Sequence, residues 1–255
     1  AIDEASMVGI DILADLNGYS LPILGTGDPY QLEPVGKDAR LMHQLDYELT
    51  EIHRQARDNP IIDLATRVRL GESWGVQDVK ECIVKKGRKP TIEELMSCDM
   101  IICGFNKTRI GVNSKIRREK KFTNLLELGD KLVIRSNDKD LGVFNGQSCE
   151  VVGVVKDFAN FIKARLKYDD GVERTTDICK RGFNNPVQPK WDFLKTIKAR
   201  QIYADYGYAR TAHTAQGSEY DSVGVIDEQW SKAWEPARWR YTSFTRAAKN
   251  LKVWL

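Results

Sequence analysis

The spacing of apolar residues changes twice along this chain, and that change most constrains how it can fold. Before residue 129, short apolar runs such as Met100–Cys103 alternate with stretches at helical spacing. From Gly129 to Asp177 the spacing becomes two, with hairpin turns at Asn145-Gly146 and Asp170-Gly171. From Gln201 the first pattern returns. We therefore expect an α/β chain with parallel sheets and an inserted small antiparallel β-barrel.

Capping signals place two helices in the second α/β region. Asn59-Pro60 is typical of a helix start, and Gly71 of a helix end. Thr91 and Glu94 have the spacing of a capping box, which predicts another helix there.

Composition and charge exclude several classes of protein. The five cysteines never form a C-x-x-C pair, which argues against a disulfide framework or a zinc module. No apolar run reaches about eighteen residues, so we expect a cytoplasmic protein without a membrane span. The net charge is +3, but residues 1–50 hold nine acids and two bases, so the remainder carries +10. The later part is therefore the expected surface for a polyanion.

Asp3 and Glu4 follow a short apolar start in the positions of a strand's carboxyl end. One carboxylate there could hold Mg²⁺ through its waters while the next orients or deprotonates an attacking water. Alone, such a pair is more often solvated surface. A buried strand needs about five residues, and only Ala1 and Ile2 precede Asp3. We therefore expect Ala1 to lie inside a strand of a longer protein.

The motif that follows the next apolar run makes a catalytic role for Asp3 and Glu4 a more specific prediction. Ile2–Met7 resembles motif II, the Walker B box of superfamily-one helicases, and Gly27–Val35 resembles their motif III, G-D-x-x-Q-L-x-P-V. The resemblance implies that Asp3 binds Mg²⁺, that Glu4 activates water and that Gln31 contacts the γ-phosphate. It also places Gly27 and Asp28 at the nucleotide. The simpler interpretation of Gly27-Asp28-Pro29 is a β-turn.

Three further segments resemble motifs of the same superfamily in the same order. Leu49–Gln55 resembles motif IV, and Tyr208–Glu219 resembles motif V with its T-x-H-x-x-Q-G-x-E pattern. Tyr241–Ala247 resembles motif VI, with Ser243 in place of the usual alanine. The five motifs span nearly the whole chain and are jointly specific.

The resemblance assigns roles within these motifs. Arg54 and Arg246 would reach the γ-phosphate, a task that suits a planar, permanently charged guanidinium. In motif V one end approaches the DNA backbone and the other the nucleotide, which gives these roles to Thr211 and His213 and to Gly217 and Glu219 respectively. Taken singly, Arg54 would be a surface salt-bridge residue and His213 part of a helix cap.

The motifs and the insertion are most similar to the RecD and Dda branch, whose members move 5′ to 3′. That branch implies a truncated first RecA-like domain at 1–46 and a second at 47–127 and 200–255. The inserted barrel and its connector would occupy 128–199.

A basic segment supplies the candidate DNA contacts. Residues 107–121 contain seven bases and one acid. Arg109, Asn113 and Arg117 recur every four residues on one helical face, and together with Asn106 they resemble a backbone-contacting element of this branch. A solvated basic face is the alternative.

No G-x-x-x-x-G-K-[ST] box occurs in the 255 residues. In the family that box lies upstream of motif II, so we expect this polypeptide alone to lack significant ATPase activity. The expected parent is an ATP- and Mg²⁺-dependent helicase acting on single-stranded DNA and duplex junctions, in a bacterial or phage-infected cell. A role in replication, repair or recombination would fit. A non-catalytic nucleic-acid-binding subunit and an RNA-directed helicase remain open, although intact Asp3, Glu4, Arg54 and Arg246 weigh against the former.

Overall fold

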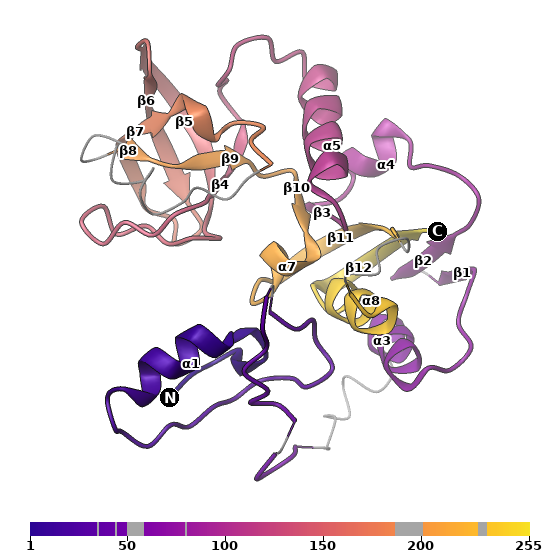
Figure 1. Cartoon of the computed structure of the whole chain (residues 1–255). Helices are drawn as coiled ribbons and strands as arrows, with labels where there is room; N and C mark the ends of the chain where they lie inside the picture. The colour runs from indigo at the N-terminus through magenta and orange to yellow at the C-terminus, as the bar shows by residue number, and fades with distance from the viewer. Residues whose placement is uncertain (35, 44, 50–58, 80, 187–200, 229–233) are drawn as a thin grey trace. The chain divides into compact units, whose positions relative to one another are not determined.

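The computed structural model has a mixed α/β fold (Figure 1). It describes residues 1–34, 36–43, 45–49, 59–79, 81–186, 201–228 and 234–255. The chain divides into two compact units, Ala1–Lys89 with Ala215–Leu255, and Pro90–Thr214. In the described part of the chain, every helix is too short or too polar to span a lipid bilayer. All five cysteines are free thiols.

The first unit begins with a pair of short extended segments and a helix. Ile2 forms a parallel bridge with Gly25, in which its N–H donates to Leu24 O at 2.7 Å and its carbonyl accepts from Thr26 N at 2.8 Å. The 3₁₀ helix η1 (Ala5–Met7) and helix α1 (Ile10–Asn17) lie between these segments. The predicted strand–helix–strand order is present, with a single bridge in place of longer strands.

The rest of the first unit is a sheet flanked by two helices. Strands β1 (Gln77–Val79), β2 (Cys82–Lys85), β12 (Ala247–Trp254) and β11 (Tyr220–Ile226) lie in that order. β1 and β2 are antiparallel, whereas β2, β12 and β11 are parallel. Helix α3 (Pro60–Leu70) packs against α8 (Pro236–Phe244), as Figure 1 shows. The core of this unit is formed by apolar side chains of the sheet and of both helices: Ile61, Leu64, Val84, Val223, Val225, Phe244 and Val253.

The predicted helix caps are confirmed. The Asn59 side chain accepts a hydrogen bond from Ile61 N at 2.9 Å, and Gly71 ends α3 with a left-handed φ of 69°. Thr91 and Glu94 form the reciprocal capping box at the start of α4 (Ile92–Met96). These signals are local, so the sequence alone is sufficient to predict them.

The second unit contains a parallel pair of strands and a second sheet. Strand β3 (Met100–Cys103) is fully buried, leads into α5 (Asn106–Glu119) and pairs in parallel with β10 (Ala209–Thr211). The short helix α7 (Ala212–Ala215) follows β10.

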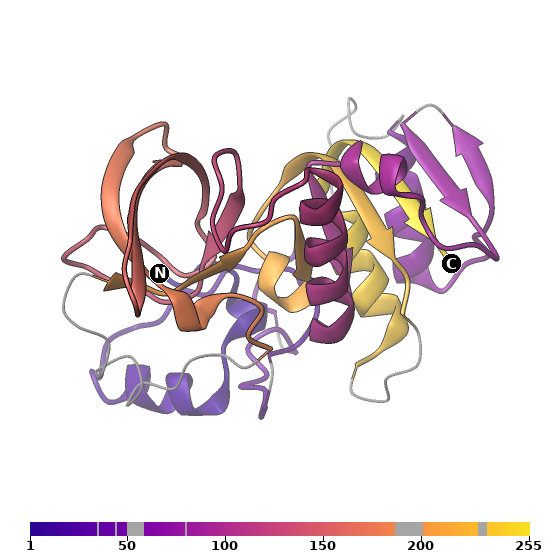
Figure 2. The same cartoon turned by 90° about the horizontal axis from the view of Figure 1, so that it is seen from above.

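The second sheet has the period-two spacing expected after Gly129. Its order is β8 (Gln201–Ile202), β7 (Glu173–Cys179), β6 (Phe161–Tyr168), β5 (Ser148–Asp157), β4 (Lys131–Ile134) and β9 (Ala204–Tyr206). All pairs are antiparallel except β7 with β8. A second 3₁₀ helix, η2 (Lys180–Gly182), follows β7. Because β8 and β9 are separated only by Tyr203, one short segment lies along both edges of the sheet, whose strands curve strongly (Figure 2).

Candidate functional site

The carboxylate of Asp3 is oriented by the adjacent extended segment. Its Oδ1 accepts hydrogen bonds from Glu4 N at 2.9 Å and from Thr26 Oγ1 at 3.1 Å. Asp3 remains exposed, so its oxygens are available to a ligand. An exposed carboxylate held directly after the Ile2–Gly25 bridge fits Mg²⁺, which prefers oxygen ligands and keeps several of its waters.

Glu4 has a strained backbone that the sequence did not predict. Its φ of 51° and ψ of 44° lie in the left-handed region, which costs a residue other than glycine about 1–2 kcal/mol. The next residue is fixed there, because Ala5 N donates to Thr26 O at 2.8 Å. The Glu4 carboxylate lies near Gly217, where Oε1 would be 3.9 Å from a Cβ added to the glycine.

Gly27 allows motifs II and III to approach each other. A Cβ at this position would lie 3.0 Å from Ala5 N and 3.1 Å from Ser6 N, closer than ordinary van der Waals contact. A side chain would therefore force η1 and the segment after Thr26 apart. The glycine is required by close packing, since its φ is not in the positive range.

Asp28 connects the turn of motif III with helix α8. Its Oδ1 accepts from Tyr30 N at 2.9 Å, the hydrogen bond of an Asx-turn, and its Oδ2 accepts from the Tyr241 hydroxyl at 2.7 Å. Burial, and then the hydrogen bond to Asp28, raises the pKa of Tyr241. The phenol therefore stays protonated and remains a donor. The turn expected at Gly27-Asp28-Pro29 is present.

Gln31 is buried, with only 7% of its surface exposed. Its Oε1 has no hydrogen-bond partner among the residues that the structure describes. Leaving a buried polar atom unpaired costs about 1–3 kcal/mol. Such an atom is expected where a ligand or an ordered water completes the site.

Arg246 brings four motifs together in the first unit. Its guanidinium is buried and donates from Nε to Thr242 O at 3.1 Å, from Nη1 to Ser218 O at 3.2 Å and from Nη2 to Thr245 Oγ1 at 3.1 Å. Burial lowers its pKa, and the nearby negative charges of Glu4, Asp28 and Glu219 oppose that effect, as Tyr241 does. A guanidinium has five N–H groups, so donors remain for an anionic ligand.

The structure says less about the predicted site residues of motif IV and about the remaining ones of motif V. Arg54 lies outside the described residues, as does most of motif IV. Gly217 adopts a left-handed φ of 72°, and Glu219 is exposed. In the second unit, Thr211 Oγ1 lies 3.0 Å from Thr214 Oγ1, and burial lowers the pKa of His213.

The basic face predicted on α5 is directed inward. Arg109 pairs with Asp205, and Arg117 forms a bidentate pair with Asp130 through Nε at 2.9 Å and Nη2 at 3.1 Å. Both aspartates are fully buried. Asn113 is also buried, donating to Tyr206 O at 3.0 Å and accepting from Ala209 N at 2.8 Å.

These contacts correct the expected exposure of the face. The four-residue spacing marks the side of α5 that packs inside the unit, because Asp130 and Asp205 neutralise its arginines there. Asn106 is exposed, but its Nδ2 donates to Pro186 O at 2.9 Å and its Oδ1 accepts from Arg109 Nε at 3.0 Å. DNA contact by these four residues stays a prediction, without support from their geometry.

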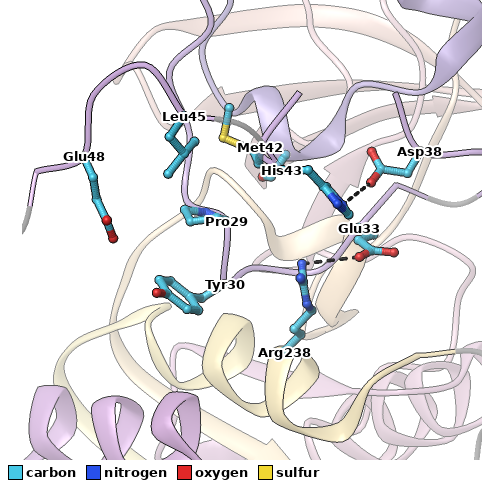
Figure 3. A pocket seen from close by; sticks show the side chains of 10 residues that line it. Pro29, Tyr30, Glu33, Asp38, Met42, His43, Leu45, Glu48 and Arg238 are labelled. Atoms are coloured by element: carbon cyan, nitrogen blue, oxygen red, sulfur yellow. Dashed lines mark ion pairs between the residues drawn. The ribbon is translucent and has the colours of Figure 1, made fainter. Parts of the chain in front are cut away.

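A polar cavity lies beside motif III (Figure 3). The ligand atoms of Glu33, Asp38 and His43 lie within 4.8 Å of one another, a spacing that could hold a metal ion. However, Arg238 Nη1 lies 3.5 Å from Glu33 Oε1, and His43 Nε2 lies 3.3 Å from Asp38 Oδ2. These ion pairs account for the cluster without a metal.

Sequence reasoning missed the contacts that α8 makes with motif III. Arg238, Tyr241 and Thr242 all reach the segment from Asp28 to Glu33. Their spacing of three and four residues marks one helical face and was the available signal. Motif similarity assigns a role only to Arg246 within motif VI, so these three contacts do not follow from it.

The comparison of sequences links the chain to helicases. Residues 206–254 match the family of the UvrD-like helicase C-terminal domain. The ATP-dependent RecD2 DNA helicase of Deinococcus radiodurans is 27% identical over 277 aligned positions, which cover 96% of this chain and 34% of that protein. The chain thus spans about a third of the length of this curated relative.

Solved structures share the fold at low sequence identity. The Pif1 helicase of Candida albicans has a TM-score of 0.61 at 18% identity, covering 99% of this chain and 70% of the other. Bacteroides Pif1 in complex with ADP-AlF3 and single-stranded DNA has a TM-score of 0.62 at 18% identity, covering 99% and 69%. The mixed α/β fold thus resembles the fold of these Pif1 helicases.

Proposed function

We propose that this chain forms part of an ATP-driven motor that moves along single-stranded DNA. Its motifs and the three comparisons support a superfamily-one helicase of the RecD/Pif1-like kind. The observation that carries the proposal is the surrounding of Arg246. Arg246 Nη1 of motif VI donates to Ser218 O of motif V, the neighbouring Tyr241 hydroxyl donates to Asp28 of motif III, and the Glu4 carboxylate of motif II lies near Gly217 of motif V. Four motifs that are far apart in the sequence therefore converge on one place.

The residues suit ATP hydrolysis in the following way. Asp3 would hold Mg²⁺, which when bound supplies positive charge for the phosphates. Glu4, held in its strained conformation, orients or deprotonates the attacking water. Gln31, Arg54 and Arg246 contact the γ-phosphate, and the arginines stabilise negative charge that develops during transfer.

The 255 residues include no Walker A box, so hydrolysis needs a phosphate-binding loop from elsewhere in the protein. A polypeptide limited to these residues is expected to show no significant turnover. The activity proposed here belongs to the protein as its gene encodes it.

The proposed substrate is DNA, which agrees with the name of the Deinococcus relative, an ATP-dependent DNA helicase. By resemblance to the RecD and Dda branch, movement would be 5′ to 3′, with duplex junctions as further partners. We also propose that 1–46 belongs to a first RecA-like domain and that 47–127 with 200–255 form a second. The inserted barrel and its connector would occupy 128–199, although β8 (Gln201–Ile202) and β9 (Ala204–Tyr206) of the curved sheet lie outside that range. A bacterial or phage-infected cytoplasm is the proposed location.

Substitution Glu4→Gln tests the motor directly. In the protein as its gene encodes it, the change should lower DNA-stimulated ATP hydrolysis by about 10²- to 10⁴-fold, because it removes the water-activating carboxylate. Binding of a fluorescent single strand should be unchanged. Strand displacement unaffected by the substitution would instead favour a non-catalytic binding subunit.

Two substrate comparisons complete the test. Forked duplexes with a single 5′ or 3′ tail report the direction of movement. DNA and RNA strands of identical sequence distinguish the RNA-directed alternative, which predicts greater stimulation by RNA.

A further inference from the structure

The backbone N–H and carbonyl of Leu32 each form a hydrogen bond with a side chain that is distant in the sequence. Leu32 N donates to Thr242 Oγ1 at 2.8 Å, and Leu32 O accepts from Gln216 Nε2 at 3.0 Å. Thr242 is fully buried, and Leu32 is 2% exposed. Water therefore cannot replace the first of these bonds without a rearrangement of the packing.

The neighbouring residue is the proposed γ-phosphate contact. Gln31 O accepts from Arg238 Nη1 at 3.3 Å, while Gln31 N donates to Asp28 O at 3.2 Å. The side-chain Oε1 of Gln31 is buried and unpaired within the described residues. The hydrogen bonds made by the backbone of Gln31 and of Leu32 therefore determine where the side-chain amide of Gln31 lies.

Thr242 also contacts Arg246, the other residue proposed to reach the γ-phosphate. Its carbonyl accepts from Arg246 Nε at 3.1 Å, while its hydroxyl accepts from Leu32 N. One residue of α8 therefore touches both the arginine of motif VI and the backbone beside Gln31. A shift of Thr242 would move both groups relative to each other.

We propose that Thr242 and Gln216 are positioning residues for ATP hydrolysis, which fix the Leu32 peptide and so hold Gln31 in register with Arg246. The proposal rests on the proposed function, which gives Gln31 and Arg246 their roles. Neither Thr242 nor Gln216 needs to touch the nucleotide. Misplacement of a contact group by about 1 Å can lower a rate about 10²-fold.

Substitutions of Thr242 that keep its size distinguish the effect of its hydroxyl from the effect of its side-chain volume. Thr242→Val keeps the shape but removes the acceptor, leaving Leu32 N buried and unpaired. In the protein as its gene encodes it, with saturating single-stranded DNA, we expect kcat to fall about 10- to 100-fold and the KM for ATP to change less than about threefold. Thr242→Ser keeps the hydroxyl and should retain kcat within about threefold.

A matched control lies on the same helix. Ser243 is fully buried, and its hydroxyl donates to Trp239 O within α8 at 2.8 Å. Ser243→Ala therefore removes a buried hydroxyl next to Thr242 without affecting Leu32, and it should leave kcat unchanged. An equal loss in Ser243→Ala and Thr242→Val would show only a general effect on α8 and would overturn the proposal.

Gln216→Glu removes the donor to Leu32 O and keeps the size of the side chain. It should lower kcat in the same direction as Thr242→Val. Wild-type kcat in both variants would also overturn the proposal.

A double-mutant cycle tests whether Thr242 acts through Gln31. In a Gln31→Ala background, the loss of kcat caused by Thr242→Val should be at least about threefold smaller than in the wild type. Equal losses in both backgrounds would reject positioning of Gln31. A wild-type protein without ATPase would contradict the proposed function itself, whereas an active wild type with insensitive Thr242 variants would contradict only this inference.

Discussion

The hydroxyl of Thr242 accepts a hydrogen bond from the backbone of Leu32 across 210 positions of sequence. This bond joins motif VI to motif III at a point where both are buried. Tyr241 repeats the connection one residue earlier through Asp28. Helix α8 therefore holds the motif III segment as well as presenting Arg246.

Gly27→Ala should disrupt the contact between motifs II and III. The new Cβ would meet backbone nitrogens of Ala5 and Ser6, which cannot move as a flexible side chain could. Overpacking of this kind typically costs about 1–3 kcal/mol. We expect a lower melting temperature and a loss of ATP hydrolysis of about tenfold or more.

Gly75 supplies the control for this change. It has no atom within 4 Å of an added Cβ and no positive φ. Gly75→Ala should leave melting temperature and hydrolysis close to wild type. If Gly27→Ala behaves like Gly75→Ala, the close approach described above is wrong.

Arg117→Ala should destabilise the protein more than it weakens DNA binding. Asp130 is fully buried, and removing Arg117 leaves its charge without the bidentate partner. Breaking a buried pair by removing one partner costs about 3–5 kcal/mol. Arg118 is exposed, so Arg118→Ala should change stability by less than about 0.5 kcal/mol.

Thermal melting and single-strand binding at low temperature measure the two effects. Arg117→Ala should melt earlier than Arg118→Ala. If Arg117→Ala instead weakens binding strongly at an unchanged melting temperature, the arginine contacts DNA and the intramolecular role is secondary.

Local signals allowed prediction of much of the fold, whereas long-range pairing did not follow from them. The capping box of Thr91 and the turn at Asp28 involve residues two or three positions apart. The pair of Arg109 with Asp205 joins residues 96 positions apart. A helical spacing shows which side chains share a face, but it does not show whether solvent or a buried carboxylate covers that face.

The candidate site shows the same limit. Motif similarity assigns proposed roles to Asp3, Gln31 and Arg246, because it depends on residue types in order. It gave no information on the left-handed backbone of Glu4 or on the role of Thr242, since both depend on packing between segments that are distant in the sequence.

Acid should destabilise the protein partly through His213. Burial lowers the pKa of this imidazole from 6.5, so the folded protein favours the neutral form. Below about pH 6.5 the unfolded chain binds the proton more readily, and stability is lost as pH falls toward the folded-state pKa. His213→Asn should reduce this loss.

Melting temperatures between pH 8 and pH 5 test the prediction. The slope with pH should be smaller for His213→Asn than for the wild type. Identical slopes for wild type and His213→Asn would refute the assignment.

Glu4→Gly should stabilise the protein by relieving backbone strain, but it should also remove ATP hydrolysis. Glu4 and Ser20 both have left-handed φ values, 51° and 53°. Glycine adopts this conformation without the steric penalty, so each change to glycine should raise stability, by up to about 1 kcal/mol. Glu4→Gly should also abolish ATP hydrolysis, because the water-activating carboxylate is lost, whereas Ser20→Gly should hydrolyse ATP like the wild type. Melting temperature and hydrolysis measured on the same preparations check both. A lower melting temperature in Glu4→Gly alone would show that its side chain contributes more to folding than the strain removes.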